Sequence, residues 1–243
     1  MRAKVHELND VHALRSAARS HAGCVRALNE DAVLDRPDIG LWAVADGMGG
    51  HNAGDVASRA VLQELGSQAA SVGDRLQRAN RRLLLHAAQT KSGPIGSTVV
   101  ALEIQAPHYT CFWVGDSRAY LIRDGRLTRL TRDHSAVQEL IDAGRITSAE
   151  AAQHPQSHVI TRAVGAEQTL AVDSRAGSIE ANDTFLLCSD GLSNVLREDE
   201  LAEVASMADL EAAAETLLAR ALRRQASDNV SVVLIRPSPR SRN

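Results

Sequence analysis

The sequence is poor in aromatic residues and carries no excess of basic ones. Only two Trp, two Tyr and two Phe occur in 243 residues, which leaves little material for the aromatic stacking platforms that bind single-stranded nucleic acid. The formal net charge is -3, whereas proteins that bind phosphate backbones usually have a basic surplus or a basic stripe. We therefore expect no nucleic-acid partner.

Cysteine is also scarce. The three cysteines, Cys24, Cys111 and Cys188, are odd in number, far apart and never paired as Cys-x-x-Cys. This spacing predicts neither a zinc site nor a redox motif. We interpret them as reduced thiols, most of them packed inside the protein.

Long apolar runs are absent as well. No stretch approaches the roughly 18 apolar residues of a membrane span, and Met1–Asp10 lacks the apolar core of a signal peptide. These absences predict a cytoplasmic protein without a membrane span. No internal repeat and no Pro/Ser-rich linker divides the chain, so we expect a single domain, 1–243.

Short apolar runs alternate with helical patterns along the chain. Asp124-Gly125 has the composition of a two-residue hairpin turn, so part of the sheet should be antiparallel. Such a mixture favours an α+β sandwich over a doubly wound parallel sheet. Strands are predicted at Ile39–Ala45, Ser97–Ile104, Tyr109–Val114, Ala119–Ile122, Thr184–Cys188 and Val230–Ile235, and helices at Asp55–Leu65, Asp74–Ala88, Glu198–Ala205 and Leu210–Gln225.

Two segments differ from this pattern. Residues 135–165 contain Gly144, Pro155 and few strong apolar runs, and are predicted to cross the surface as a flap subdomain. The end of the chain from Arg236, and residues 237–243 above all, is predicted to be a disordered tail.

Familiar phosphate-binding motifs are missing. Gly49 and Gly54 have the spacing of a P-loop, but Asp55 stands where its lysine is required. A dinucleotide fingerprint starting at Gly47 fails at Asn52. No cysteine has an arginine six residues later, which excludes a cysteine phosphatase, and no Asp-x-Asp nucleophile motif is present.

Aspartates follow the apolar strands repeatedly. Asp46, Asp116 and Asp190 each come after such a strand, and Asp228 stands just before another. A single Asp-Gly after a strand is usually only a turn. Four buried carboxylates gathered at one sheet end would need cations, however. A set of oxygen ligands without His or Cys favours Mg²⁺ or Mn²⁺ over zinc, and the scattered positions make a calcium loop less favoured.

Six segments in this order resemble the metal-dependent Ser/Thr protein phosphatases, the PPM or type 2C family, in its short bacterial form. The similarity spans nearly the whole chain. The segments are Gly23–Asp31, Val44–His51, Gly96–Thr98, Val114–Tyr120, Ser189–Leu192 and Ser227–Val230.

The resemblance implies a four-layer αββα sandwich, two antiparallel sheets flanked by helices, with a binuclear metal centre at one end. The two catalytic residues would be Asp46 and Arg26. Asp46 would bridge two Mn²⁺ or Mg²⁺ ions, and Arg26 would bind the substrate phosphate. Asp190 and Asp228 would complete the first metal site. The resemblance also implies that the Gly47 carbonyl and Glu30 bind the second ion and that Asp31 holds metal-bound water. Asp116 with Asp190 would bind a third, weaker ion.

Elementary chemistry agrees with these roles. Two cations about 3.5–4 Å apart lower the pKa of a bridging water and neutralise charge on the phosphoryl oxygens. The planar fork of an arginine can donate two hydrogen bonds to a tetrahedral anion. Where animal relatives have a histidine proposed as general acid, this chain has Met48, which leaves the proton donor for the leaving alkoxide unassigned. His51 is near in sequence but is equally typical of a helix cap.

The sequence thus predicts an enzyme, a monomeric protein serine/threonine phosphatase whose partners are phosphorylated proteins and a cognate bacterial Ser/Thr kinase. Two alternatives stay open. One is a regulatory phosphoprotein binder that has lost catalysis. The other is a small-molecule phosphohydrolase, which would share the mechanism and differ only in the flap and the pocket.

Overall fold

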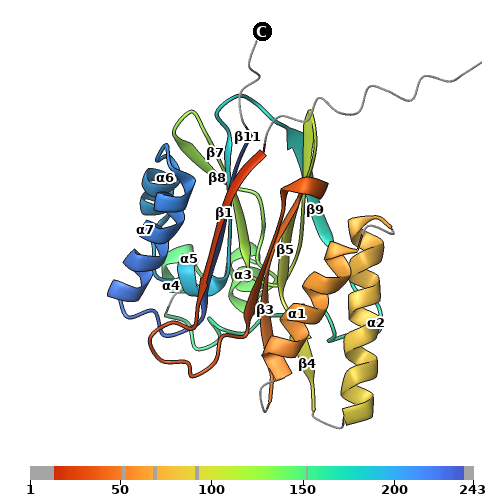
Figure 1. The fold of residues 1–243 in the computed structure, drawn as a ribbon. Coiled ribbons are helices and arrows are strands. Elements are labelled where there is room, and N and C mark those ends of the chain that lie inside the picture. Colours follow the sequence, from red (N-terminus) through yellow and green to blue (C-terminus); the bar gives the residue numbers. More distant parts are fainter. Residues whose placement is uncertain (1–13, 51–52, 68–69, 91–92, 152, 238–243) are drawn as a thin grey trace, which may run out of the picture.

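Two antiparallel sheets lie face to face in the computed structural model, which describes residues 14–50, 53–67, 70–90, 93–151 and 153–237 (Figure 1). The first sheet has the strand order β1-β11-β10-β7-β8. Its strands are β1 (Leu14–His21), β7 (Arg118–Arg123), β8 (Arg126–Arg129), β10 (Thr184–Cys188) and β11 (Val230–Pro237).

The second sheet has the order β2-β3-β5-β6-β9, and β4 pairs with the end of β3. Its strands are β2 (Asp31–Arg36), β3 (Leu41–Gly49), β4 (Ile95–Ser97), β5 (Val99–Gln105), β6 (His108–Val114) and β9 (Asp173–Ser178). A short 3-10 helix, η1 (Pro37–Ile39), connects β2 to β3. All pairings within both sheets are antiparallel.

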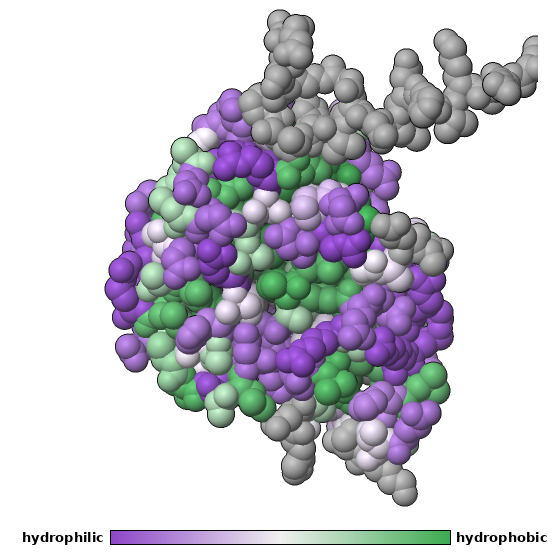
Figure 2. Space-filling view, in the orientation of Figure 1, coloured by the Kyte–Doolittle hydropathy of each residue, from purple (hydrophilic) through white to green (hydrophobic). Residues whose placement is uncertain are grey.

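Helices cover the outer face of each sheet, so the molecule has four layers. Helices α1 (Ala53–Gly66) and α2 (Val72–Thr90) pack on the second sheet, and α6 (Glu198–Ala205) and α7 (Leu210–Arg223) pack on the first (Figure 1). The predicted αββα sandwich is confirmed. Figure 2 shows the same face of the molecule, mostly hydrophilic along α2 and apolar in the centre.

Burial on both faces explains why the central strands are continuous apolar runs. On β3, Trp42 and Val44 point between the sheets, whereas Leu41, Ala43 and Ala45 point towards α1 and α2. A strand with helices on one side and a second sheet on the other has no solvent-facing side. These were the strands that the sequence predicted, and each of them is present.

Local sequence signals fix the turns and helix starts. Asp124 and Gly125 connect β7 to β8 with φ values of 50° and 74°, the left-handed conformation that a two-residue hairpin requires. The Asp209 side chain accepts hydrogen bonds from the backbone N–H groups of Glu211 and Ala212, and so caps the start of α7.

The strands at the edges of the sheets were not predicted from the sequence. In β1 only Ala17 is buried, and β9 has no buried residue. An edge strand is held mainly by backbone hydrogen bonds to one neighbour, so its side chains need no apolar pattern.

The prediction of a tail from Arg236 was wrong for its first two residues. Arg236 and Pro237 belong to β11, where Pro237 pairs with Leu14. The Arg236 guanidinium donates hydrogen bonds to the carbonyls of Ala205, Met207 and Ala208, which fixes this end of the strand. Residues 238–243 lie outside the described residues.

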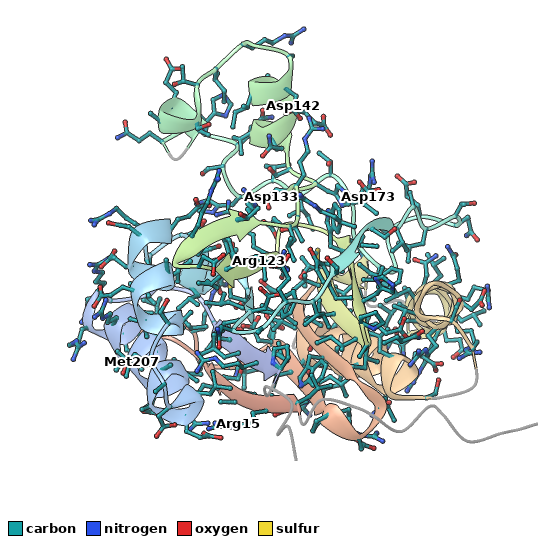
Figure 3. The ribbon with its side chains drawn as sticks, turned by 90° about the horizontal axis from the view of Figure 1, so that it is seen from above. Arg15, Arg123, Asp133, Asp142, Asp173 and Met207 are labelled. Carbon is teal, nitrogen blue, oxygen red and sulfur yellow. The ribbon has the colours of Figure 1, made fainter. Side chains whose placement is uncertain are left out.

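Residues 135–165 protrude from the sandwich, as the position of Asp142 in Figure 3 shows. They contain the short helices α3 (Ala136–Asp142) and α4 (Ser148–Ala151). Ser135 and Ile160 form an isolated bridge at the base of the segment. Within the described part of the chain, no helix has the length and apolar character needed to cross a membrane.

Candidate metal centre

The strand-end aspartates meet at one end of the sandwich. Asp31 begins β2 and pairs in register with Asp46 of β3. Asp190 follows β10 and starts the short helix α5 (Asp190–Ser193). Because β11 runs antiparallel to β10, Asp228, which precedes β11, lies at this same end.

These residues surround one cavity of about 480 Å³. Seven of the eight site residues predicted from the sequence line it together. The cavity is lined by Arg26, Glu30, Asp46, Gly47, Asp116, Asp190 and Asp228, and also by Met48, Thr98 and His158. Asp31 lies behind Asp46, close enough for its charge to raise the pKa of the Asp46 carboxyl.

The backbone of Asp46 is held from the link between β4 and β5. Its N–H donates to Thr98 Oγ1 at 3.2 Å, and its carbonyl accepts from Thr98 N–H at 2.8 Å and from Ser97 Oγ at 3.0 Å. Thr98 is held in turn by Ser117, whose Oγ lies 2.8 Å from Thr98 Oγ1. The Asp46 side chain is therefore carried by a fixed piece of backbone.

Asp31 is a buried carboxylate that is only partly satisfied. Its Oδ2 accepts a hydrogen bond from Ser189 Oγ at 2.7 Å, while its Oδ1 is buried without a partner among the described residues. An unpartnered buried carboxylate oxygen is costly unless a ligand or water satisfies it.

The side chain of Asn229 holds the loop that carries Arg26 and Glu30 through three hydrogen bonds. Asn229 accepts from the Glu30 N–H at 2.8 Å and donates to the carbonyls of Ala22 and Leu28 at 3.0 and 2.9 Å. Gly23 has a φ of 78°, and a Cβ there would lie 2.1 Å from the Asp228 carbonyl oxygen. The loop is therefore pressed directly against the segment that bears Asp228.

Arg26 lies at the mouth of the cavity and pairs with Asp228. Its Nε and Nη2 donate to the two carboxylate oxygens at 3.0 and 2.9 Å. Arg26, which was predicted to bind phosphate, and Asp228, which was predicted to bind metal, thus form an ion pair with each other in this structure. Both groups are partly exposed, 57% and 41%, so an incoming anion and cation could separate them at modest cost.

Glu30 and Gly47 lie where β3 passes the start of α1. Glu30 Oε1 accepts from the Gly54 N–H at 3.1 Å. A Cβ at Gly47 would lie 1.8 Å from the Gly54 carbonyl oxygen. Only glycine fits at this crossing.

The carboxylates repel one another. Burial first, and then the charges of Asp31, Asp190, Asp116 and Asp228, raise the pKa of Asp46 well above its usual range. Burial, opposed by hydroxyl hydrogen bonds and reinforced by neighbouring aspartates, raises the pKa of Asp31 to about 7. Burial and the charge of Asp190 do the same for Asp116, whose pKa is also about 7. The site stabilises positive charge.

The donor set fits hard divalent cations. Its ligands are carboxylate and carbonyl oxygens, which suit Mg²⁺ and Mn²⁺, and the orphaned Asp31 oxygen points to a missing polar partner. Within the described ranges, no three His, Cys, Asp or Glu side chains already converge as a preformed ion site would.

Three contributors were not assigned a role from the sequence. Thr98 and Asn229 lie inside segments that carry the family resemblance. The sequence therefore pointed to these two positions, but it did not predict the hydrogen bonds that they make. His158 comes from the protruding segment and lines the cavity, where its charge opposes the burial that raises the pKa of Asp190. No local signal distinguishes it from other loop histidines. His51 lies outside the described residues.

Comparison with known proteins agrees with this geometry. Residues 5–230 match the sequence model described as "Protein phosphatase 2C". The chain is 40% identical over 237 residues to the serine/threonine protein phosphatase PstP of Mycobacterium tuberculosis, covering 91% of this chain and 44% of PstP. The chain thus spans less than half the length of that relative.

Two solved structures extend the similarity. The PstP catalytic domain in complex with two manganese ions superposes with a TM-score of 0.83 at 35% identity, covering 93% of this chain and 99% of that one. PppA, described as a key regulatory component of T6SS in Pseudomonas aeruginosa, gives a TM-score of 0.86 at 40% identity, covering 93% and 98%.

Proposed function

Because this chain belongs to the protein phosphatase 2C family, we propose that it hydrolyses phosphoserine and phosphothreonine in proteins with the help of two Mn²⁺ or Mg²⁺ ions. The observation that carries the proposal is the meeting of Asp46, Asp190 and Asp228 with Arg26 around one cavity. Carboxylates supply the cation site, and the guanidinium supplies the anion site beside it.

Each predicted residue then has a place in the mechanism. Asp46, Asp190 and Asp228 would hold the first ion, and Asp46, the Gly47 carbonyl and Glu30 the second. Asp31 would orient the attacking water, and Asp116 with Asp190 would hold a third, weaker ion. When bound, the ions lower the pKa of that water and offset the charge that builds on the phosphoryl oxygens.

Arg26 would change partners during substrate binding. In the structure its guanidinium forms a two-fold hydrogen bond with Asp228. A phosphate offers the same pair of acceptor oxygens, so the guanidinium can rotate from carboxylate to phosphate without changing its bonding pattern. Asn229 keeps the loop in place while this exchange occurs.

Residues 135–165 would act as the flap subdomain of a single domain, 1–243. Support comes from His158 and Ile160, which this segment contributes to the cavity wall. A wall made by a protruding segment is well placed to influence which phosphoproteins enter.

The wider setting is also proposed. We expect the enzyme to oppose a bacterial Ser/Thr kinase, and to act as a monomer in the cytoplasm. The three free cysteines support a reducing compartment, since secreted proteins usually pair theirs. A complete set of carboxylates around the cavity supports catalysis over a regulatory binder that has lost it.

Hydrolysis of p-nitrophenyl phosphate and of phosphothreonine peptides with Mn²⁺ tests the proposal. We expect activity that EDTA removes and that Asp46→Asn abolishes. Asp38→Asn is the matched control, because Asp38 is an exposed carboxylate that pairs with Arg36 and lies outside the cavity lining. Robust hydrolysis in EDTA would reject the mechanism.

A further inference from the structure

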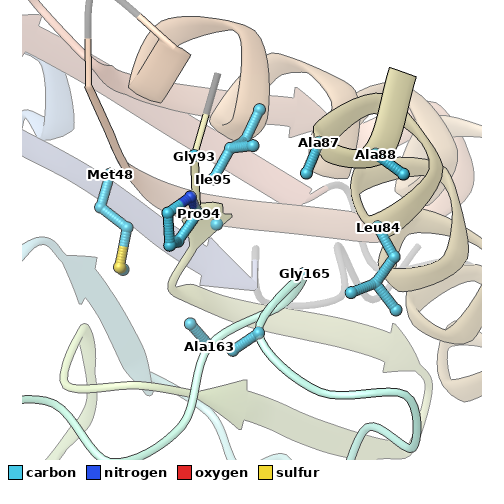
Figure 4. A pocket seen from close by; sticks show the side chains of 11 residues that line it. Met48, Leu84, Ala87, Ala88, Gly93, Pro94, Ile95, Ala163 and Gly165 are labelled. Carbon is cyan, nitrogen blue, oxygen red and sulfur yellow. The ribbon is translucent and has the colours of Figure 1, made fainter. Parts of the chain in front are cut away.

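A second cavity opens beside the candidate metal centre. It has a volume of about 640 Å³ and lies between the end of α2, strand β4 and the segment around Ala163–Ala166 (Figure 4). Met48 lines this cavity and also the catalytic cavity. The two spaces are therefore neighbours that share Met48 as a wall, and we refer to the second one as the Met48 groove.

The lining of the Met48 groove is apolar throughout. Leu84, Ala87 and Ala88 form the wall on α2, and Ile95 and Pro94 lie across from them (Figure 4). Among the described residues, no charged or hydrogen-bonding side chain belongs to the lining. A concave surface of this kind binds apolar groups, and methionine adapts its shape to different ones.

The floor of the groove is rigid. Gly96 pairs with Met48 across β3 and β4, and Ser97 exchanges two backbone hydrogen bonds with Val164 at 3.0 and 2.8 Å. The buried side chain of Asn80 accepts from the Gly165 N–H at 2.7 Å. A Cβ at Gly96 would lie 3.0 Å from the Val164 carbonyl oxygen, so small residues keep the groove open.

Large apolar side chains are exposed close in sequence to residues that line the catalytic cavity. Val25, next to Arg26, is 72% exposed, and Leu28 is 45% exposed. Val159 is 45% exposed and stands between His158 and Ile160, which line the cavity. Exposed large apolar side chains of this kind are typical of surfaces that bind a partner.

We propose that the Met48 groove binds an aliphatic or aromatic side chain of the phosphorylated substrate polypeptide, close in sequence to the phosphoresidue. The inference rests on the proposed phosphatase function and names a feature of its substrates. The shared Met48 wall selects this occupant, because a side chain in the groove would leave its own backbone beside the cavity that Arg26 and the carboxylates line.

The test compares phosphothreonine peptides that carry Leu, Ala, Asp or Lys at each position within three residues of the phosphothreonine. For the native enzyme with Mn²⁺ we expect kcat/KM to be at least about tenfold higher with Leu than with Asp at one or two positions. The gain should appear mainly in KM.

Ala88→Glu and Leu85→Glu provide the matched pair of variants. Both positions are exposed on α2, but Ala88 lines the groove and Leu85 does not. In Ala88→Glu, the peptide with Leu should still be preferred over the peptide with Asp, but its kcat/KM should be about tenfold lower than with the native enzyme. The peptide with Lys at the same position should become a better substrate than the peptide with Leu. Leu85→Glu should keep the native order and rates.

The two proposals fail differently. If the native enzyme hydrolyses p-nitrophenyl phosphate with Mn²⁺ but shows no side-chain preference, or if both variants behave alike, the groove proposal is wrong and the phosphatase function stands. If no phosphate ester is hydrolysed, both are wrong.

Discussion

Asp31 and Asp46 face each other across the β2–β3 register, two acidic residues side by side at the end of a buried sheet. Antiparallel neighbours with like charge destabilise a sheet, and here Asp190, Asp116 and Asp228 add to the repulsion. The fold therefore maintains a concentration of negative charge that bound cations, or protonation of the carboxyls, would relieve. The repulsion destabilises this end of the fold, and the same carboxylates are the ones that would bind metal.

Removing one carboxylate should stabilise the metal-free protein. We expect Asp46→Asn to raise the free energy of unfolding in EDTA by about 1 kcal/mol, which corresponds to a rise in Tm of about 2–4 °C for a chain of this size. Calorimetry measures it. Added Mn²⁺ should raise the Tm of the native protein and not that of the variant, and a lower Tm of the variant in EDTA would contradict the repulsion argument.

Arg26 should affect substrate and metal in opposite directions. Arg26→Ala removes charged hydrogen bonds to phosphate, so kcat/KM for a phosphopeptide should fall about 10- to 100-fold. It also frees Asp228, so Mn²⁺ should bind about two- to fivefold more tightly. Titration calorimetry measures the second effect.

Arg26→Lys serves as the comparison for that variant. Lysine keeps the charge but has no planar fork, so hydrolysis should recover only in part. Weaker Mn²⁺ binding by Arg26→Ala would show that the Arg26–Asp228 pair assists the ion site.

Asn229 should matter for both stability and catalysis. Its side chain makes three hydrogen bonds to the loop that carries Arg26 and Glu30, and it is only 4% exposed. Asn229→Ala should lower the free energy of unfolding by about 2 kcal/mol, because buried backbone groups lose their partners. Urea unfolding measures the loss. Ser206→Ala, which removes one exposed hydrogen bond, should change it far less.

The cysteines should differ sharply in reactivity. Burial raises the pKa of the Cys111 and Cys188 thiols to about 12, so almost none of either is thiolate at pH 8. Cys24 is exposed. Ellman's reagent should therefore titrate one thiol in the native protein and three in guanidinium. Cys24→Ser should remove the native signal, and a second fast thiol would show that a buried cysteine becomes exposed.

The sequence by itself determined the central strands, the main helices and the class of chemistry. Leu41–Ala45 are apolar without interruption because both faces of β3 are covered. This need for apolar residues on both faces can be recognised in a short stretch of sequence. Asp46, Asp190 and Asp228 could likewise be identified by their places beside strands. Edge strands such as β1 left no such pattern, because backbone hydrogen bonds to one neighbour suffice for them.

Only the tertiary structure decided which groups meet. Asn229 donates a hydrogen bond to the Leu28 carbonyl from 201 residues away, Arg26 pairs with Asp228 across 202 residues, and Met48 lines both an apolar groove and a charged cavity. Local patterns record burial and turn chemistry. Contacts between distant segments depend on how the two sheets stack, and no short stretch of sequence contains that information.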